Sequence, residues 1–406
     1  MRFDFHLRSQ VKEQITQLAT QMHSWDDVPK VNDLEKMHLQ DAITSFQHTI
    51  NIEPFTIGGV DGSGDYPSLT YSDSFVYVTL AQGTVYQSNT DRGLKEVGPL
   101  GEPIIDFLWL PEEKKQRINN FTAGLGRLAG SPVETVIDES DYRKLNGKIA
   151  GKTHSISQLT DNMICPHASD SSNIGIQLRI TGELGAAARL LSAETPPDIT
   201  LIDSTFSLPT LGSAKTSLFF EHLKRWCCVK ASQRNLLFAA LSKSHGLPGI
   251  GLIEQLAKEK LKPDALGQAE HWFLRLPQTG IEDWETTLTD GRTLPPLQTV
   301  TYLVRFHRTT PVLRLDIDLT YWQQHLQGKS SEQTKQNECH LFEQLDYASH
   351  DQRCYGYPYP IKAAHDRASL TKQERVVLRK QIIDAAVKMG MRRNLFRDAS
   401  QATGHA

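Results

Sequence analysis

The chain has 406 residues, of which 39% are hydrophobic and 22% charged, and its formal net charge is −3. This composition is typical of a globular protein with a sizeable core and excludes disordered and fibrous classes. No run of about 18 uncharged apolar residues occurs, so we expect no membrane span and a cytoplasmic location. Five cysteines without CxxC spacing argue against a disulfide framework and a thiolate zinc site.

The first half of the sequence contains a helical segment followed by a hairpin. In residues 1–50, apolar residues at spacings of three and four predict helices that pack on or beside the core. A β-type run at 55–60 ends in the turn-like Asp61-Gly-Ser-Gly, and the strand pattern resumes at 75–80 and, after a Gln-Gly break, at 84–86. Residues 87–173 are less regular, apart from a helix expected at 112–128, and are interpreted as an insertion or second lobe.

The second half alternates strands and helices. The predicted elements are strands at 174–180, 199–202 and 236–241, helices from Glu183 and from about 213 to 230, antiparallel strands at 299–306 and 312–319, and a final helix opened by the capping box Thr371-Lys-Gln-Glu374. The strand-helix-strand order between 199 and 241 indicates a parallel crossover. Alternation in 312–319 predicts one buried and one solvated face. The final helix is expected to have an apolar face that includes Leu378 and Met389.

Positive charge is concentrated at the C-terminal end. Residues 361–406 contain ten Lys or Arg and four Asp or Glu, a net charge of +6 that leaves −9 for the rest of the chain. This pattern fits an edge that binds a polyanion beside a metal-binding core, although a solvated helix face would look the same. The candidate contacts are Arg367, Lys372, Arg375 and Arg379.

Three acidic residues lie where a metal site on a sheet would need them. Asp61 and Asp203 each follow a predicted strand, and Glu183 opens a helix twenty residues before Asp203. Neighbouring strands lie about 4.8 Å apart, so carboxylates at adjacent strand ends can bridge two hard cations. Asp198 and Glu194 compete for the third position, but they precede the strand.

The two aspartates also have a simpler explanation. Asp-Gly is the commonest hairpin turn dipeptide, so Asp61 would be a turn residue, and Asp203 would cap the turn or helix that follows its strand. Spacing alone leaves both explanations open.

The order of several short blocks resembles the NurA nuclease family. The blocks are Asp61-Gly-Ser, an upstream Glu183, Ile199-Thr-Leu-Ile-Asp203-Ser, Lys243-Ser, and Tyr355-Gly-Tyr357-Pro-Tyr359-Pro-Ile-Lys-Ala-Ala-His365. The match spans roughly residues 55–380. Ser-Thr follows Asp203 where Gly-Ser is commoner in the family, and the family tyrosine corresponds to Tyr355, Tyr357 or Tyr359.

This resemblance implies a ribonuclease H-like nuclease that depends on Mn²⁺ or Mg²⁺, with two ions expected, and that cuts DNA as an exonuclease, an endonuclease or both. It also implies a homodimer that works with a HerA-type hexameric ATPase in DNA repair or antiphage defence. The implied metal ligands are Asp61, Glu183 and Asp203, and the implied catalytic residues are Lys243, Tyr357 and His365. The resemblance also implies that the polyanion bound at the basic C-terminal edge is DNA.

The chemistry of the later residues suits these roles. Lys243 at a strand end would present a positive charge to the phosphate in the transition state, and His365 could ligate a metal or transfer a proton near neutral pH. The tyrosines between 355 and 359 could stack on unpaired bases. Otherwise Lys243 would be a solubilising charge, and His365 and the tyrosines would serve packing alone.

The chain is therefore expected to have an α/β fold, a ribonuclease H-like mixed sheet flanked by helices. We divide it into an N-terminal helical segment at 1–50, a NurA-like nuclease domain at 51–370 with an insertion at about 87–173, and a basic C-terminal helix at 371–406. Two other functions remain: an inactive adaptor that docks on an ATPase ring, which the intact acids argue against, and an Argonaute-like strand binder, for which additional lobes are missing.

Overall fold

The structure is a computed structural model of the chain. It describes residues 9–25, 33–64, 67–89, 93–97, 102–141, 146–149, 152–155, 171–206, 219–245, 247, 249–261, 271–277, 299–308 and 310–397. Its contacts define a small unit, Met1–Thr44 with Gly246–Ala269, and a main unit, Ser45–His245 with Glu270–Ala406. All predicted site residues belong to the main unit.

The small unit is helical in its described residues. It contains α1 (Ser9–Trp25), α2 (Asp33–Ala42) and α8 (Ile250–Lys260), and β1 (Ile43–Ser45) follows α2 directly. The helices predicted near the N-terminus are thus present, whereas their packing on or beside the core stays a prediction. Ile15 and Leu18, on the predicted apolar face of α1, are 60% and 55% exposed. Lys260 at the end of α8 donates to the carbonyls of Gln40 and Asp41 at 2.8 and 3.0 Å.

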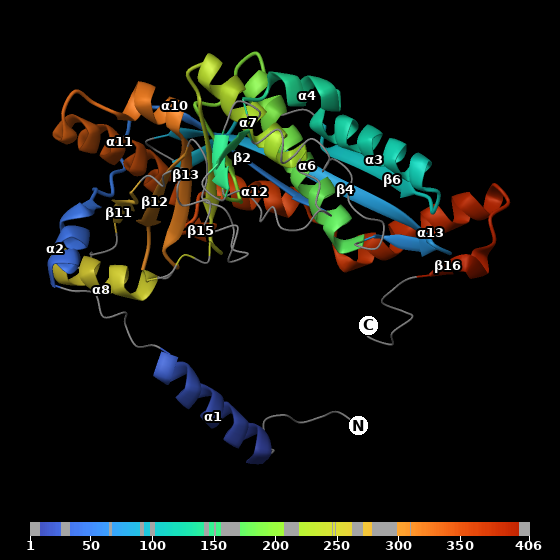
Figure 1. Cartoon of the computed structure of the whole chain (residues 1–406), viewed down its shortest axis with the longest axis horizontal. Helices are drawn as coiled ribbons and strands as arrows, with labels where there is room; N and C mark the ends of the chain where they lie inside the picture. Colours follow the sequence, from blue (N-terminus) through green and yellow to red (C-terminus); the bar gives the residue numbers. More distant parts are fainter. Residues whose placement is uncertain are drawn as a thin grey trace. The chain divides into compact units, whose positions relative to one another are not determined.

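A mixed β-sheet forms the centre of the main unit (Figure 1). Its strands are β2 (Thr56–Ser63), β3 (Leu69–Tyr71), β4 (Ser74–Asn89), β5 (Gly93–Glu96), β6 (Ile104–Leu110), β9 (Ile199–Ile202), β10 (Leu237–Ser242), β11 (Trp272–Arg275), β12 (Thr299–Arg305), β13 (Leu313–Asp318) and β16 (Phe396–Arg397). The order is β11-β12-β13-β10-β9-β2-β4, and β3, β5 and β6 also pair with β4. The pairs β2-β9 and β9-β10 are parallel, and the other described pairs of these strands are antiparallel.

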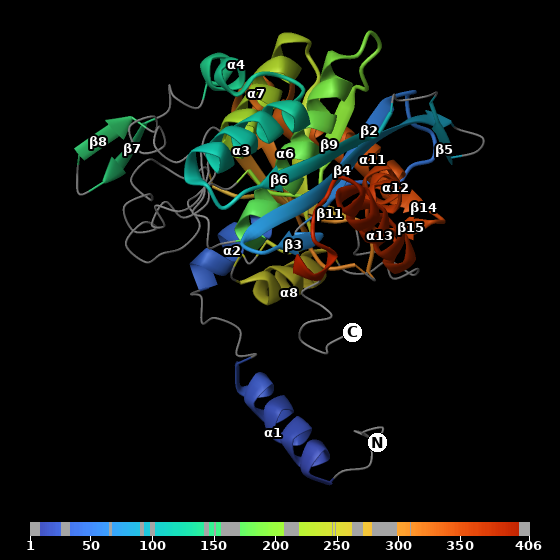
Figure 2. The same cartoon turned by 90° about the vertical axis from the view of Figure 1, so that its right-hand side faces the viewer.

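Helices cover both faces of this sheet (Figures 1 and 2). On one face lie α3 (Lys114–Ala129), α4 (Val133–Glu139), α6 (Ser171–Ser192) and α7 (Phe219–Gln233), and on the other lie α11 (Ser331–Ser349) and α12 (Tyr359–Ala368). The remaining elements are the short α10 (Leu319–Tyr321), the π-helix η3 (Trp322–Leu326), α13 (Lys372–Lys388), the 3₁₀-helix η4 (Arg393–Leu395), and the hairpins β7-β8 (Asn146–Ile149, Lys152–Ser155) and β14-β15 (His350–Asp351, Cys354–Tyr355).

Alternate residues of the central strands enter two separate cores. In β10, Phe238 and Ala240 pack under α6 and α7, whereas Leu237, Ala239 and Leu241 pack in the core that includes α11 and α12. Because both faces are covered, such a strand reads as a continuous apolar run instead of an alternating one. Such apolar runs are why β9 and β10 could be predicted from the sequence.

The strand predicted at 174–180 is wrong. Helix α6 runs through these residues, and Glu183 lies in its interior instead of opening it. Ile174 and Leu178 are buried at a spacing of four, while Ile176, which a strand would bury beside Ile174, is 39% exposed. The alternation in the sequence was misleading because the polar Gln177 is buried whereas the apolar Ile176 is exposed.

The solvated face predicted for residues 312–319 is also wrong. The predicted antiparallel pair exists as β12 and β13, but every residue of β13 is buried. Its charges are paired inside the protein: Arg314 Nε lies 2.8 Å from Asp316 Oδ1 within the strand, and Arg225 Nη1 of α7 lies 2.7 Å from Asp318 Oδ1. Alternation of charge was therefore a sign of buried ion pairs.

Helices α3 and α13 and strand β6 also correspond to segments considered in the sequence. The helix expected at 112–128 is α3, and the capping box of α13 forms between Thr371 and Glu374. No described residue of α13 is fully buried, so its predicted apolar face is not a packed one. Within 87–173, β6 pairs with β4 and so belongs to the sheet. The first residues of the helix predicted from about 213 lie outside the described part, and α7 starts at Phe219.

No helix in the described part of the chain combines the length and the apolar character needed to cross a membrane.

Candidate active site

The register of two parallel strands brings Asp61 and Asp203 together. Strands β2 and β9 pair Val60 with Ile202, so the next residue of each strand is an aspartate at the same edge of the sheet. The Asp-Gly hairpin turn considered for Asp61 is wrong, because β2 continues to Ser63 and Asp61 lies opposite Gln82 of β4. The carboxylate of Asp61 accepts a hydrogen bond from the Gly62 N–H at 2.7 Å.

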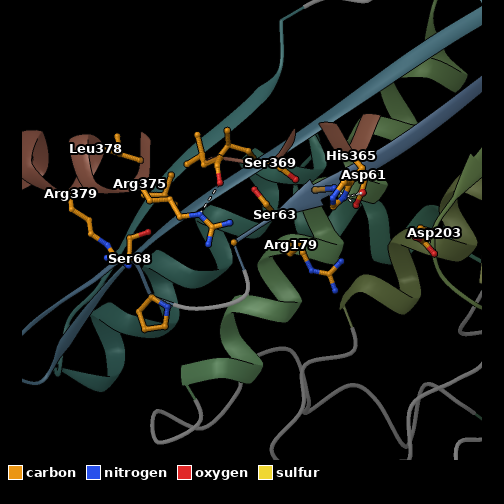
Figure 3. A pocket seen from close by; sticks show the side chains of 16 residues that line it. Asp61, Ser63, Ser68, Arg179, Asp203, His365, Ser369, Arg375, Leu378 and Arg379 are labelled. Atoms are coloured by element: carbon orange, nitrogen blue, oxygen red, sulfur yellow. Dashed lines mark hydrogen bonds and ion pairs between the residues drawn. The ribbon is translucent and has the colours of Figure 1, made fainter. Parts of the chain in front are cut away.

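His365 reaches Asp61 from helix α12. Its Nδ1 lies 2.7 Å from Asp61 Oδ2, and Figure 3 shows the two side chains pointing at each other in the cavity. The Asp61 side chain is 10% exposed and that of His365 is 58% exposed. The pair therefore joins a nearly buried carboxylate to an imidazole that is open to solvent.

A glycine lets α12 lie directly on β2. A Cβ on Gly59 would lie 2.4 Å from both Pro360 C and Ile361 N in the first turn of α12. Thr84 of β4 donates its hydroxyl to Pro360 O at 2.7 Å and fixes the same turn. This close approach sets the height of α12 above the sheet and so the position of His365.

Glu183 approaches from α6 on the opposite face of the sheet. A Cβ on Gly62 would lie 2.9 Å from Glu183 Cγ, so the absence of a side chain there makes room for it. Glu183 is 5% exposed and forms an ion pair with Arg179, one helical turn earlier. Burial raises the pKa of Glu183 to about 8; Arg179 opposes this rise, and the charges of Asp61 and Asp203 add to it.

Lys243 and Tyr357 complete the group on the side of Asp203. Lys243 follows β10, whose Ala240 pairs with Ile202, and its Nζ lies 3.2 Å from Asp203 Oδ2. The same Nζ lies 4.2 Å from the centroid of the Tyr357 ring. The acid, the lysine and the tyrosine thus form one contiguous cluster.

The geometry separates the three tyrosines that the sequence left open. Tyr357 is buried, and burial together with the charges of Asp203 and Asp61 keeps the pKa of its hydroxyl well above the ordinary value. Tyr359 instead lies under the Arg353 guanidinium, 3.5 Å from its ring centroid, and Tyr355 is 49% exposed. Tyr357 is therefore the tyrosine beside the acids.

A cavity of about 530 Å³ opens over part of this group, and Glu183, Lys243 and Tyr357 are not among its lining residues. Asp61, Asp203 and His365 line one part of it, and α13 contributes Arg375 and Arg379 (Figure 3). Of the predicted DNA contacts, Arg375 and Arg379 thus border the cavity. Arg367 is paired with Glu96 at 2.7 Å, and neither Arg367 nor Lys372 lines the cavity.

Sequence reasoning missed Arg179, which also lines the cavity. Its spacing of four from Glu183 would have marked it as a partner, but the residues around it were interpreted as a strand.

The two acids that competed with Glu183 for the third metal-ligand position lie elsewhere. Asp198 accepts hydrogen bonds from Thr56 N and Oγ1 before β2 and β9 begin to pair, and Glu194 is exposed.

The donor set fits a divalent cation. Glu183 lies close enough to Asp61 and Asp203 for their charges to raise its pKa, with Arg179 and Lys243 as the cations paired to the group, and a bound dication would favour the ionised form of all three carboxylates. Asp61, Glu183 and Asp203 are the residues that would hold hard cations, because Mg²⁺ and Mn²⁺ prefer oxygen ligands.

Comparison with solved structures finds nucleases. The chain is similar to the NurA nuclease from Sulfolobus solfataricus, at 12% identity and a TM-score of 0.44, covering 95% of this chain and 99% of that one. A NurA structure with manganese is similar at 10% identity and a TM-score of 0.42, again covering 95% of this chain and 99% of that one. Ciona intestinalis Endonuclease V in complex with a 24mer DNA is similar at 11% identity and a TM-score of 0.30, covering 88% of this chain and 96% of that one. Members of the NurA family, which the motif order resembles, are among the solved structures to which the chain is similar. No protein-family model and no curated protein matches the chain.

Proposed function

We propose that this protein is a nuclease that hydrolyses DNA with the help of divalent metal ions, Mn²⁺ or Mg²⁺. The observation that carries the proposal is the parallel register of β2 and β9, which sets Asp61 and Asp203 side by side. Glu183 supplies a third carboxylate from the other face of the sheet, close enough for the two aspartates to raise its pKa. This is a donor set for a pair of hard cations.

The chain's own residues have separable roles in this reaction. Two metal ions, when bound, would activate the attacking water and stabilise the leaving oxygen of the phosphodiester. His365 orients the Asp61 carboxylate through Nδ1, and its exposed ring is placed to carry a proton to and from solvent. Lys243 holds a positive charge beside Asp203, where negative charge accumulates on the phosphate. Tyr357 stays protonated at neutral pH and can donate a hydrogen bond.

We further propose that the sheet is ribonuclease H-like. The antiparallel pair β2-β4 comes first in the chain, and β9 and β10 then add in parallel, with α6 before β9 and α7 between β9 and β10. This order of a hairpin followed by parallel crossovers supports the assignment. It also explains the site, because carboxylates at the ends of the adjacent strands β2 and β9 face the same cavity.

DNA is the proposed substrate because the cavity combines acids with a basic wall. Arg375 and Arg379 border the cavity from α13, where they can contact phosphates while the acids hold the metals. The proposed partners are a second copy of the chain and a HerA-type hexameric ATPase, and the proposed setting is DNA repair or antiphage defence. These partners and this setting rest on the order of the sequence motifs.

The test is DNA cleavage by the purified chain, alone and with a HerA-type ATPase, in Mn²⁺, Mg²⁺ or EDTA. We expect cleavage with Mn²⁺ or Mg²⁺, none in EDTA, and none for Asp203→Asn. Asp198→Asn is the matched control, because Asp198 bonds to Thr56 away from the cavity. Equal cleavage by Asp203→Asn and the unaltered chain would refute the site. If no DNA is cut under any condition, the protein is the adaptor considered above.

A further inference from the structure

A second cluster of ionisable side chains surrounds Asp346 near the end of α11. Asp346 is completely buried, and both of its carboxylate oxygens face imidazoles. His48 Nδ1 lies 2.7 Å from Oδ2, and His271 Nδ1 and His350 Nδ1 lie 3.0 and 3.2 Å from Oδ1. In the described part of the chain, the ion-pair partners of Asp346 are all histidines.

We propose that His48, Asp346 and His350 form a transition-metal site, suited to Zn²⁺ and distinct from the candidate active site. One ligand atom from each of the three residues lies within 4.8 Å of those from the other two. Ligands of tetrahedral zinc, at about 2.1 Å from the ion, lie about 3.4 Å from one another. Small side-chain adjustments would therefore bring all three onto one ion.

The kind of ligand distinguishes this site from the acid cluster. Two imidazoles and one carboxylate match zinc and its neighbours in the first transition series, whereas Mg²⁺ favours oxygen ligands alone. A carboxylate taken out of water needs a positive partner, and a dication held by Asp346 would supply it. The two sites should thus take different metals from the same solution.

The surroundings supply what a metal ligand needs. His271 is 8% exposed and bonds to Asp346 through Nδ1, so it holds the carboxylate in place without being one of the three ligands. Such outer partners orient metal ligands in proteins. The His48 side chain is 33% exposed and gives the ion a path from solvent, and the rings of His48 and His350 lie 4.1 Å apart between centroids.

An ion at this position would join segments that are distant in sequence. His48 precedes β2, whereas Asp346 lies in the last turn of α11 and His350 begins the β14-β15 hairpin. That hairpin leads to Gly356, whose N–H donates to Ser349 O at 2.6 Å, and then to Tyr357 of the candidate active site. The proposed role is therefore structural: the ion fixes the start of the segment that delivers Tyr357 and α12.

The test uses the full chain with Asp61→Asn and Asp203→Asn, so that the acid cluster does not contribute metal. After incubation with Zn²⁺ and dialysis, we expect about one zinc ion per chain by mass spectrometry, and with Co²⁺ the visible absorption of a site with nitrogen ligands. His48→Asn and His350→Asn should each abolish zinc retention. His271→Asn should weaken zinc affinity roughly 10- to 100-fold.

The matched control is His340→Asn, which changes an exposed histidine on α11, the helix that carries Asp346. This variant should retain zinc like the parent chain. Circular dichroism confirms folding of each variant, and His48→Asn is the mildest change because that side chain is partly exposed. The proposal is overturned if the folded parent chain retains no zinc, in which case the histidines only bind the carboxylate. It is also overturned if folded His48→Asn and His350→Asn retain zinc as the parent does.

Discussion

His365 Nδ1 lies 2.7 Å from Asp61 Oδ2, although 304 positions separate the two residues in the chain. Asp61 belongs to a central strand of the sheet and His365 to a helix near the C-terminus. The contact exists because the first turn of α12 lies against Gly59, two residues before Asp61. The candidate active site is thus assembled from both ends of the main unit.

Replacing His365 should impair the chemistry without unfolding the protein. We expect His365→Gln to lower DNA cleavage by roughly 100-fold, the lower range for loss of a group that moves or steers a proton. The side chain is 58% exposed, so the unfolding temperature should change little. His340→Gln, exposed on α11, serves as the control, and cleavage by His365→Gln equal to this control would remove His365 from the site.

Lys243 should act on the rate more than on binding. Because its Nζ lies beside Asp203, we expect Lys243→Ala to lower kcat by roughly 100- to 1,000-fold with a small change in KM, as for other groups that stabilise transition-state charge. Lys243→Arg should recover part of the loss. Lys258→Ala, an exposed lysine of α8, is the control. A change in KM alone would show that Lys243 only binds substrate.

Gly59→Ala should displace α12. The added methyl would lie 2.4 Å from the backbone of Pro360 and Ile361, which cannot move as a side chain can. We expect a loss of about 1–3 kcal/mol in unfolding free energy, as for overpacked cores, together with loss of cleavage. Gly251→Ala in α8 has open space around its Cβ and should leave both unchanged or raise stability slightly. Denaturant unfolding of both variants distinguishes the two outcomes.

Arg375 and Arg379 should contribute more to DNA affinity than the other basic residues of the C-terminal region. Both border the cavity, whereas Lys372 does not. We expect Arg375→Ala and Arg379→Ala each to weaken binding and to lower the slope of log affinity against log salt by about 1. Lys372→Ala should leave the slope nearly unchanged. Equal effects at all three positions would mean that the charge of this region acts without specific contacts.

Glu183 should make the metal-free protein sensitive to pH. Its pKa rises from 4.5 to about 8 on folding, mainly through burial, so the unfolded chain loses this proton first as pH rises. The stability that this group contributes is therefore present below pH 4.5 and is lost as pH rises to about 8.

Thermal unfolding in EDTA between pH 5 and 8 checks this effect. Relative to the unaltered chain, Glu183→Gln should flatten the fall in unfolding temperature, while Glu134→Gln, exposed on α4, should not. Added Mn²⁺ should raise the unfolding temperature of the unaltered chain at pH 8, because it favours the ionised carboxylate. An identical pH slope for Glu183→Gln and the unaltered chain would contradict the raised pKa.

Local patterns identified much of the fold. The apolar runs of β9 and β10, the antiparallel pair β12-β13 and the capping box of α13 depend on residues close in sequence, and they were predicted correctly. Helix α6 was missed in part because its buried Gln177 obscured the helical period. Asp318 of β13 was assigned to solvent because its partner Arg225 comes from another element, α7.

By itself the sequence determined which residue types follow which strands: acids after Val60 and Ile202, and a lysine after Ser242. Only the tertiary structure decided that Asp61 and Asp203 share one cavity and that Lys243 and Tyr357 lie beside Asp203. It also decided that His48 and His350 meet at Asp346. The physical reason is that hydrophobic periodicity and turn chemistry act over a few residues. Strand register and helix docking are fixed by burial and hydrogen bonding between segments hundreds of residues apart.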